Sequence, residues 1–166
     1  LDAELYVRSV HAYDAYLSGR ADIRYDFKRN RVVFIVKDGK KVVDAVGRSM
    51  DGRSPKWYRY GSNGYPFVCG GSDSGVVGED CASACSVANF LSGIALLGTS
   101  LLDSYIPTLR TYDRLVVALD KDATKKALEL VRRLQAIRPT SLVILDKDVK
   151  DMTDDERRNT FDKYLT

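Results

Sequence analysis

Apolar residues follow two different patterns along the chain. In the first half, Arg31–Val36 and Lys41–Gly47 are separated by Asp38 and Gly39, and two β-rich segments around Asp-Gly predict a β-hairpin. After residue 75, short continuous apolar runs alternate with segments of helical periodicity. Strands buried on both faces have such continuous runs, so this half predicts a parallel sheet covered by helices on both faces.

The elements expected in the second half form a regular alternation. Strands are expected at Val76–Gly78, Gly93–Leu97, Leu115–Leu119 and Ser141–Leu145, and helices at Cys81–Leu91, Ser100–Leu109 and Ala123–Ile137. Thr153 and Glu156 have the spacing of a capping box and predict a C-terminal helix.

The first half predicts a smaller α+β unit. Residues 2–18 have apolar positions near helical spacing, with Gly19 as the expected end of a helix. Short strands are expected around Lys56–Tyr60 and Pro66–Cys69, in a stretch rich in Gly, Ser, Pro and aromatic residues. The fold class is therefore α/β: a Rossmann-like parallel sheet over residues 73–166, preceded by an α+β lobe over residues 1–72.

Composition excludes several classes of protein. The 166 residues are 45% hydrophobic and 30% charged, the balance of a globular protein and not of a fibrous or disordered one. An apolar run such as Leu115–Leu119 is far shorter than the roughly 20 residues that span a bilayer, so no membrane association is expected.

Charge is divided unequally between the two halves. Residues 1–70 contain 13 Lys and Arg against 8 Asp and Glu, whereas residues 71–166 contain 13 against 15. A basic first lobe and an acidic second lobe indicate an anionic polymer bound by one and a metal ion bound by the other. Differences of this size also occur on ordinary solvated surfaces, and that alternative stays open here.

Three cysteines (Cys69, Cys81 and Cys85) and one histidine (His11) limit the available chemistry. A zinc site normally needs four ligands, or three and a water, and this chain could supply four only by bringing His11 across the whole fold. A hydrolase with a catalytic histidine would also need His11. Because His11 lies in the expected N-terminal helix, we interpret it as an ordinary helix residue. An odd number of cysteines without a disulfide pattern indicates a reducing compartment, so a cytoplasmic location is expected.

Acidic residues follow the ends of the expected strands. They are Glu79 after the first strand, Asp120 and Asp122 after the third, and Asp146, Asp148 and Asp151 after the fourth. Parallel strands end at one edge of a sheet, so these carboxylates should converge, and their repulsion must be relieved by a cation or by raised pKa values. Mg²⁺ prefers such oxygen ligands. Single Asp residues are also common in turns and helix caps, which explains one of these positions but not the set.

These acidic motifs resemble those of the toprim domain. VVGED contains Glu79, VVALDKD contains Asp120 and Asp122, and ILDKDVKD contains Asp148 and Asp151. The toprim domain is shared by bacterial-type primases, type IA and type II topoisomerases, OLD-type nucleases and RecR-type recombination proteins. The resemblance covers residues 75 to about 155 and implies a toprim-like parallel sheet.

The first 70 residues resemble the basic subdomain that precedes the toprim domain in bacterial and phage primases. The matching segments are AYLSGR, a hairpin, VGR, SPKWYRY and YPFVCG. The match implies that Arg48 and Lys56 contact nucleotide phosphates or the template. Arg59, Lys121 and Lys147 are further candidates for nucleotide or template binding. Trp57, Tyr58 and Tyr60, interleaved with Lys56 and Arg59, either stack bases or fill the core of the first lobe.

Several positions depart from the family pattern. Asp80 stands where the family usually has Gly, Ser83 where many primases have Asp, and Lys121 in the middle of the Asp-x-Asp motif. A basic residue expected after the phenylalanine turn is not found around Phe67. These departures suggest a divergent phage, plasmid or mobile-element relative.

The resemblance implies an enzyme, a DNA primase, that joins NTPs into an RNA primer on a single-stranded DNA template during replication. It implies Glu79, Asp120 and Asp122 as catalytic residues, with Glu79 as ligand or proton acceptor. The metal ligands would be Glu79, Asp120, Asp122, Asp148 and Asp151, holding Mg²⁺ or Mn²⁺, with two ions expected. A replicative helicase, in trans or fused, is an expected partner, in a bacterial or phage-infected cell. A toprim nuclease or topoisomerase-like DNA cleavage, and a non-catalytic nucleic-acid-binding module, remain the alternatives.

Overall fold

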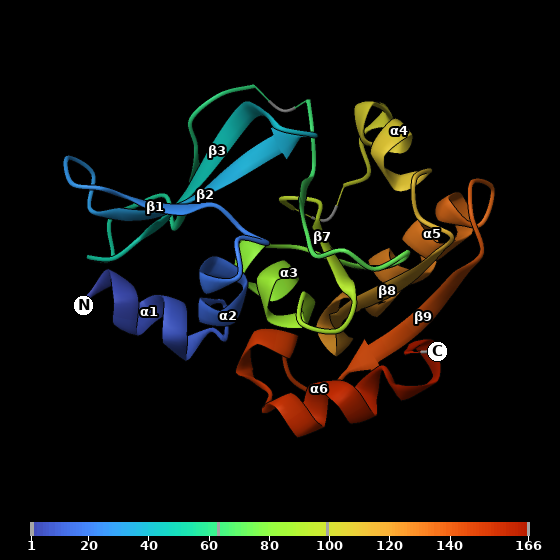
Figure 1. Cartoon of the computed structure of the whole chain (residues 1–166). Helices are drawn as coiled ribbons and strands as arrows, with labels where there is room; N and C mark the ends of the chain where they lie inside the picture. The colour runs from blue at the N-terminus through green and yellow to red at the C-terminus, as the bar shows by residue number, and fades with distance from the viewer. Residues whose placement is uncertain (1, 63, 99, 166) are drawn as a thin grey trace.

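Two β-sheets with different strand arrangements organise the chain (Figure 1). The computed structural model describes residues 2–62, 64–98 and 100–165. The antiparallel sheet has the order β1-β2-β3-β4 and the mixed sheet the order β5-β7-β6-β8-β9. The strands of the antiparallel sheet are β1 (Ile23–Asp26), β2 (Arg31–Asp38), β3 (Lys41–Ser49) and β4 (Trp57–Arg59). Those of the mixed sheet are β5 (Phe67–Cys69), β6 (Ser74–Gly78), β7 (Ser92–Ala95), β8 (Arg114–Asp120) and β9 (Thr140–Leu145).

The β2–β3 hairpin confirms the turn predicted at Asp38 and Gly39. Asp38 pairs with Lys41, and Gly39 takes a φ of 61°, which a residue without a Cβ adopts at no steric cost. β1 was not predicted, because its sequence IRYD contains no apolar run, and in the fold only Ile23 of its four residues is buried.

The N-terminal helix predicted over residues 2–18 is broken into two. α1 (Ala3–Ser9) and α2 (Tyr13–Leu17) are joined by residues 10–12, where His11 has a φ of 62°. His11 Nδ1 lies 2.7 Å from the carbonyl oxygen of Lys150, 139 residues away in sequence. A tertiary contact therefore accompanies the break that periodicity alone does not show.

Helices cover both faces of the mixed sheet, as predicted. Its helices are α3 (Cys81–Val87), α4 (Ile106–Leu109), α5 (Thr124–Leu134) and α6 (Asp154–Thr160). Val117 on β8 packs in one apolar cluster with residues of α4 and α5, whereas Val116 packs in another with residues of α3 and the segment around α6. The alternation along β8 supplies a core on each side. Over the described residues, every helix is too short or too polar to cross a membrane.

The helix predicted at Ser100–Leu109 is shorter than expected. A 3₁₀ turn at Asp103–Tyr105 leads into the four-residue α4. Pro107 lies in the first turn of α4, where its missing N–H costs nothing. The capping box predicted for the C-terminal helix is confirmed, since Thr153 and Glu156 each accept a hydrogen bond from the other's backbone.

The two sheets share one apolar core. Phe34 of β2 meets Phe67 of β5 with ring centroids 5.9 Å apart, and Cys85 of α3 belongs to the same buried cluster. β5 lies before the boundary predicted at residue 72 but pairs with β7 in the mixed sheet. The two expected lobes therefore interlock through β5, and their division at residue 72 stays a prediction.

Arg157 of α6 supports the loop that follows β9, and its loss should destabilise the fold. Its side chain is fully buried, and Nη1 donates to the carbonyl oxygen of Val149 at 3.1 Å and to that of Met152. Arg157→Ala leaves buried acceptors unsatisfied, so the free energy of unfolding should fall by about 2–4 kcal/mol. Urea denaturation measures it. The exposed neighbour variant Arg158→Ala should change stability by less than about 1 kcal/mol, and an equal loss in both variants would contradict this role.

Candidate active site

The mixed sheet has a topological switch point at the carboxyl ends of β6 and β8. β6 is central, the chain passes from it to β7 on one side, and then to β8 on the other. In open sheets of this kind the two connections leave in opposite directions and open a crevice where ligands bind. The crevice here lies between Glu79, after β6, and Asp120, at the end of β8.

The crevice brings together three of the predicted metal-binding residues. A cavity of about 160 Å³ is lined by Glu79, Asp120 and Asp148, together with Ser83 of α3 and apolar strand residues. We call it the carboxylate crevice. Strand ends and the adjoining α3 therefore place oxygen donors from three separate segments around one small space.

Two other predicted ligands lie outside the lining of this crevice. Asp122 lies in the 3₁₀ turn after β8, where its backbone N–H donates to Asp120 Oδ1 at 3.0 Å, and its side chain is exposed. Asp151 ends the 3₁₀ turn Val149–Asp151 and is exposed as well. Their roles as ligands stay predictions.

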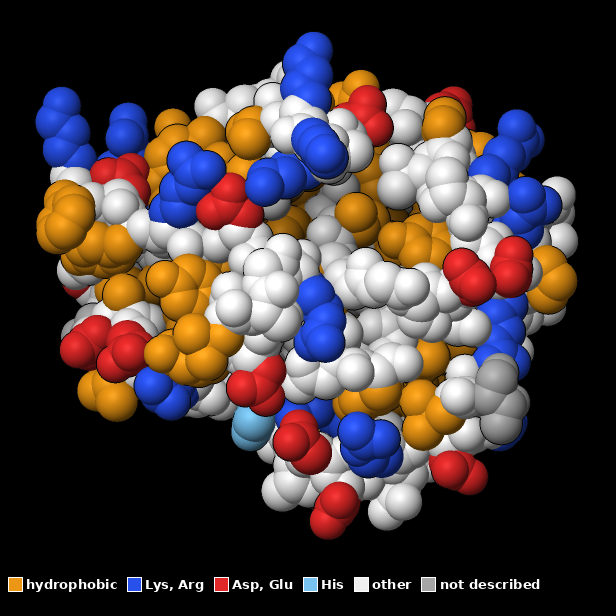
Figure 2. Space-filling view, viewed as in Figure 1, with side chains coloured by type: hydrophobic (Ala, Val, Ile, Leu, Met, Phe, Trp, Pro, Cys, Tyr) orange, Lys and Arg blue, Asp and Glu red, His pale blue; other side chains and the backbone are white. Residues whose placement is uncertain are grey.

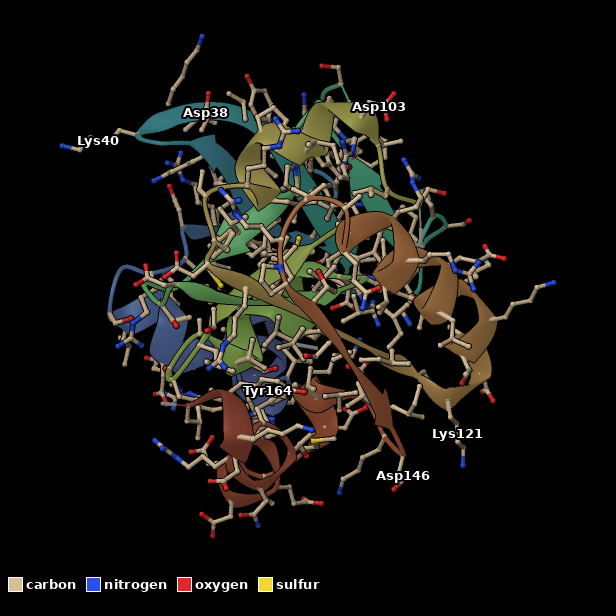
Figure 3. The ribbon with its side chains drawn as sticks, turned by 90° about the vertical axis from the view of Figure 1, so that its right-hand side faces the viewer. Asp38, Lys40, Asp103, Lys121, Asp146 and Tyr164 are labelled. Carbon is tan, nitrogen blue, oxygen red and sulfur yellow. The ribbon has the colours of Figure 1, made fainter. Side chains whose placement is uncertain are left out.

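Two predicted basic residues also lie away from the crevice lining. Lys121 extends outward from the turn after β8 (Figure 3). The acidic residue Asp146, at the end of β9, lies near it. Lys147 pairs with Glu156, whose Oε2 is 2.8 Å from its Nζ. Their binding roles are not supported by an inward orientation.

Asp80, Ser83, Lys150 and Asp148 form a closed network beside the crevice. The Ser83 N–H donates to Asp80 Oδ1 at 2.9 Å, and the Ser83 hydroxyl donates to Asp148 Oδ1 at 2.8 Å. Lys150 Nζ lies 2.8 Å from Asp80 Oδ2 and 3.4 Å from Asp148 Oδ2. The residues that depart from the family pattern, Asp80 and Ser83, are thus bonded to each other and to Asp148.

The network was missed at the level of the sequence. Lys150 follows β9 in a run of alternating charges, DKDVKD, that gives no sign of which side chain turns inward. Asp80 has the position of an N-cap, and it caps α3. Only the fold, which brings residue 150 beside residue 80, shows that Lys150 lies between two carboxylates.

Charge and burial shift the pKa values of this region. Partial burial, and then the negative charges of Asp80 and Asp148, raise the pKa of Glu79. Burial opposes the charge on Lys150, but the adjacent carboxylates of Asp80 and Asp148 outweigh it and raise the pKa of Lys150. Lys150 is therefore a cation at neutral pH, and the carboxyl of Glu79 ionises against an unfavourable field.

A second, larger cavity joins the crevice to the antiparallel sheet. It has a volume of about 460 Å³, and its lining includes Lys56, Trp57 and Arg59 on one side and Glu79, Asp148 and Lys150 on the other. We call it the junction cavity. Figure 2 shows Lys and Arg side chains on the visible surface of the antiparallel sheet, in the upper left part of the view. The structure thus places basic groups of one lobe opposite acidic groups of the other.

Arg59 is held toward the junction cavity by a buried carboxylate. Arg59 Nη1 lies 3.2 Å from Asp44 Oδ2, and the side chain of Asp44 is 1% exposed. The backbone N–H of Gly61 donates to Asp44 Oδ1 at 2.9 Å. A Cβ at position 61 would lie 2.8 Å from that oxygen, which is too close, so a residue without a side chain fits at this position.

The aromatic residues of the β4 region take part in packing. Trp57 is half-buried against Phe34, with ring centroids 5.8 Å apart, and also lines the junction cavity. Tyr58 and Tyr60 meet edge to face at 5.0 Å, and the Tyr60 hydroxyl donates to Asp26. Trp57 packs against the core of the first lobe, whereas Tyr58 and Tyr60 are half-buried outside the apolar clusters, and base stacking stays a prediction.

Arg48 is not among the residues that line the junction cavity, and its role in binding nucleotide or template stays a prediction. Its Nη1 donates to the carbonyl oxygen of Ser49 at 2.6 Å, and its guanidinium lies 5.5 Å from the ring centroid of Tyr6 and 6.0 Å from that of Trp57. Lys56 and Arg59 line the cavity, whereas Arg48 supports Trp57 from the side.

The carboxylates fit a divalent cation that keeps most of its waters. Within the described parts of the chain, no three His, Cys, Asp or Glu side chains are arranged as a ready-made metal site. Mg²⁺ is often bound through only one or two carboxylates together with waters and substrate phosphates. Glu79 and Asp120, which line the same crevice, provide that donor set.

The raised pKa of Glu79 predicts that removing its charge stabilises the metal-free protein. A carboxyl whose pKa is higher in the folded state stabilises the fold below its unfolded value of 4.5, and this contribution is lost as the pH rises through the folded value. Glu79→Gln should therefore raise the melting temperature at pH 7 in EDTA and leave it unchanged below pH 4.5. The exposed Glu129→Gln on α5 is the control. An equal or lower melting temperature for Glu79→Gln at pH 7 would contradict the electrostatic account.

Comparisons with known proteins place this geometry in a known fold. No protein-family model and no curated protein matches the chain. A solved DNA primase domain from Pseudomonas aeruginosa matches with a TM-score of 0.64 and 19% identity, over 91% of this chain and 58% of that one. The E. coli primase catalytic core matches with a TM-score of 0.64 and 19% identity, over 95% and 58%.

A third similar structure is that of a DnaG primase catalytic domain bound to single-stranded DNA. It has a TM-score of 0.64 and 20% identity, and the match covers 91% of this chain and 57% of that one. This chain thus spans less than three fifths of the length of each of these three proteins. At this level of identity the likeness concerns the fold, and the chain has the fold of the DNA primase catalytic core.

Proposed function

We propose that this chain is the catalytic part of a DNA primase, which joins ribonucleotides into a primer on single-stranded DNA. The observation that carries the proposal is the connection between two adjoining sites. Glu79 and Asp148 line both the carboxylate crevice and the junction cavity, where Lys56 and Arg59 lie opposite them. Such an arrangement suits a nucleoside triphosphate. Its phosphates would contact Lys56 and Arg59 on one side and a cation held by the carboxylates on the other.

In the proposed reaction, the 3′-hydroxyl oxygen of the growing chain attacks the α-phosphorus of an NTP. A new P–O bond forms, the bond to the β-phosphate breaks, and pyrophosphate leaves with that electron pair. A divalent cation bound at the crevice would favour loss of the hydroxyl proton and stabilise charge on the phosphates. Two ions are the expectation from the family resemblance.

The residues of this chain would act mainly by position and charge. Glu79 and Asp120 would hold the cation, and the raised pKa of Glu79 also suits it to accept the hydroxyl proton. Arg59, oriented by the buried Asp44, would bind a phosphate through its guanidinium, and Lys56 would act as a point charge.

The template is proposed to be single-stranded DNA. A similar DnaG primase catalytic domain has been solved bound to single-stranded DNA, and residues 1–70 of this chain carry its excess of positive charge. Binding would be dominated by contacts between Lys or Arg side chains and backbone phosphates. A replicative helicase as partner remains part of the same proposal.

Substitution of Asp120 tests the proposed chemistry. Asp120→Asn keeps the size of the side chain but removes a charge from the crevice, so incorporation of labelled NTPs on single-stranded DNA with Mg²⁺ or Mn²⁺ should fall by about 100-fold or more. Extension is measured on a sequencing gel. Asp146→Asn, at the neighbouring strand end, should retain activity. Cleavage of DNA without NTPs would instead identify a nuclease, and unchanged incorporation by Asp120→Asn would exclude Asp120 from the reaction.

Substitution of Lys56 tests the proposed DNA contact. Lys56→Ala should weaken binding of single-stranded DNA and reduce the slope of log K against log salt by about 0.7, as expected for one lost phosphate contact. Fluorescence anisotropy over a salt series measures both. Lys40→Ala, at the exposed hairpin tip seen in Figure 3, is the control. Binding that is independent of salt would count against the proposed template site.

A further inference from the structure

Lys150 has an unusual place for a lysine beside a cluster of carboxylates. Its side chain is 19% exposed, and its Nζ reaches Asp80 Oδ2 at 2.8 Å and Asp148 Oδ2 at 3.4 Å. The ammonium therefore lies between two carboxylates from different segments of the chain, one after β6 and one after β9.

The carboxylates on either side of Lys150 are satisfied by protein donors. Asp80 accepts from the Ser83 N–H and from Lys150, one bond to each oxygen. Asp148 accepts from the Ser83 hydroxyl with Oδ1 and faces Lys150 with Oδ2. Each of the four oxygen atoms thus meets a donor or a positive charge of the chain itself, and the Lys150 ammonium occupies the position between the two carboxylates.

The backbone of Lys150 is held in place from two directions. Its carbonyl oxygen lies 2.7 Å from His11 Nδ1, and the carbonyl oxygen of the preceding Val149 accepts a hydrogen bond from the buried Arg157. On a freely moving loop, a lysine would not keep its ammonium at one position beside the carboxylates. This one is attached to a supported turn, which keeps its ammonium near Asp80 and Asp148.

We propose that the Lys150 ammonium takes the place of one divalent cation, so that the carboxylates hold one exchangeable metal ion, at Glu79 and Asp120, instead of the expected pair. The inference builds on the metal site of the proposed function. Lys150 offsets the repulsion between Asp80, Asp148 and Glu79 as a bound cation does, and it does so without leaving the protein. The carboxylates on the α3 side thus have a cation of the chain itself, and the metal ion is left to Glu79 and Asp120.

The test is a count of bound metal ions. Isothermal titration calorimetry with Mn²⁺, without nucleotide or DNA, should give one ion for the wild type. Lys150→Met removes the ammonium and keeps an unbranched side chain of similar size, so it should bind one ion more than the wild type. Lys147→Met removes a lysine three positions away that pairs with Glu156, and its stoichiometry should equal that of the wild type.

A second variant guards against loss of the fold. Lys150→Gln keeps an N–H donor for Asp80 or Asp148 but no charge, and it carries the same expectation of one additional ion. A gain of one ion in a folded Lys150 variant, absent from Lys147→Met, supports the proposal. Two ions in the wild type, or no gain in either Lys150 variant, would overturn it.

These outcomes are distinct from failure of the proposed function. A wild type that binds one Mn²⁺ but joins no NTPs would refute the primase activity and leave the role of Lys150 intact. A wild type that joins NTPs and binds two ions would retain the activity and refute the role of Lys150.

Discussion

Repulsion between carboxylates in one crevice is the constraint on which the site depends. Parallel strands end together, so a chain that places Glu79, Asp120 and Asp148 at those ends accumulates negative charge in a small space. Ser83 and Lys150 reduce that charge on the α3 side, while the β8 side retains Asp120 at the crevice. Because of this difference, a cation is attracted more strongly to the β8 side of the crevice than to the α3 side.

The shared core of the two sheets brings basic residues of the first lobe to this site. Lys56 and Arg59 belong to the region of the antiparallel sheet, yet they line the same cavity as Glu79 and Asp148. The contact between Phe34 and Phe67 anchors the antiparallel sheet against β5, and with it β4, next to the crevice. Apolar packing thus fixes the separation between basic and acidic groups, and the buried Asp44 refines it by orienting Arg59.

Much of this architecture follows from local pattern. The hairpin, the parallel strands and the positions of Glu79 and Asp120 could be predicted because continuous apolar runs and strand-end acids are properties of short segments. The break between α1 and α2 could not, because it coincides with a contact between His11 and Lys150 that is distant in sequence. Likewise, periodicity does not distinguish Lys147, which faces Glu156, from Lys150, which lies between Asp80 and Asp148.

The contact between His11 and the carbonyl oxygen of Lys150 joins segments 139 residues apart. Together with the hydrogen bond from Arg157 to Val149, it means that the turn beside the crevice is held by both an early and a late part of the chain. On a ribosome, which releases the N-terminal part first, α1 and both sheets emerge while this turn still lacks its support from α6. The turn therefore gains its full support only after α6 has been made, and a nascent chain carries Glu79 and Asp120 before it carries Lys150.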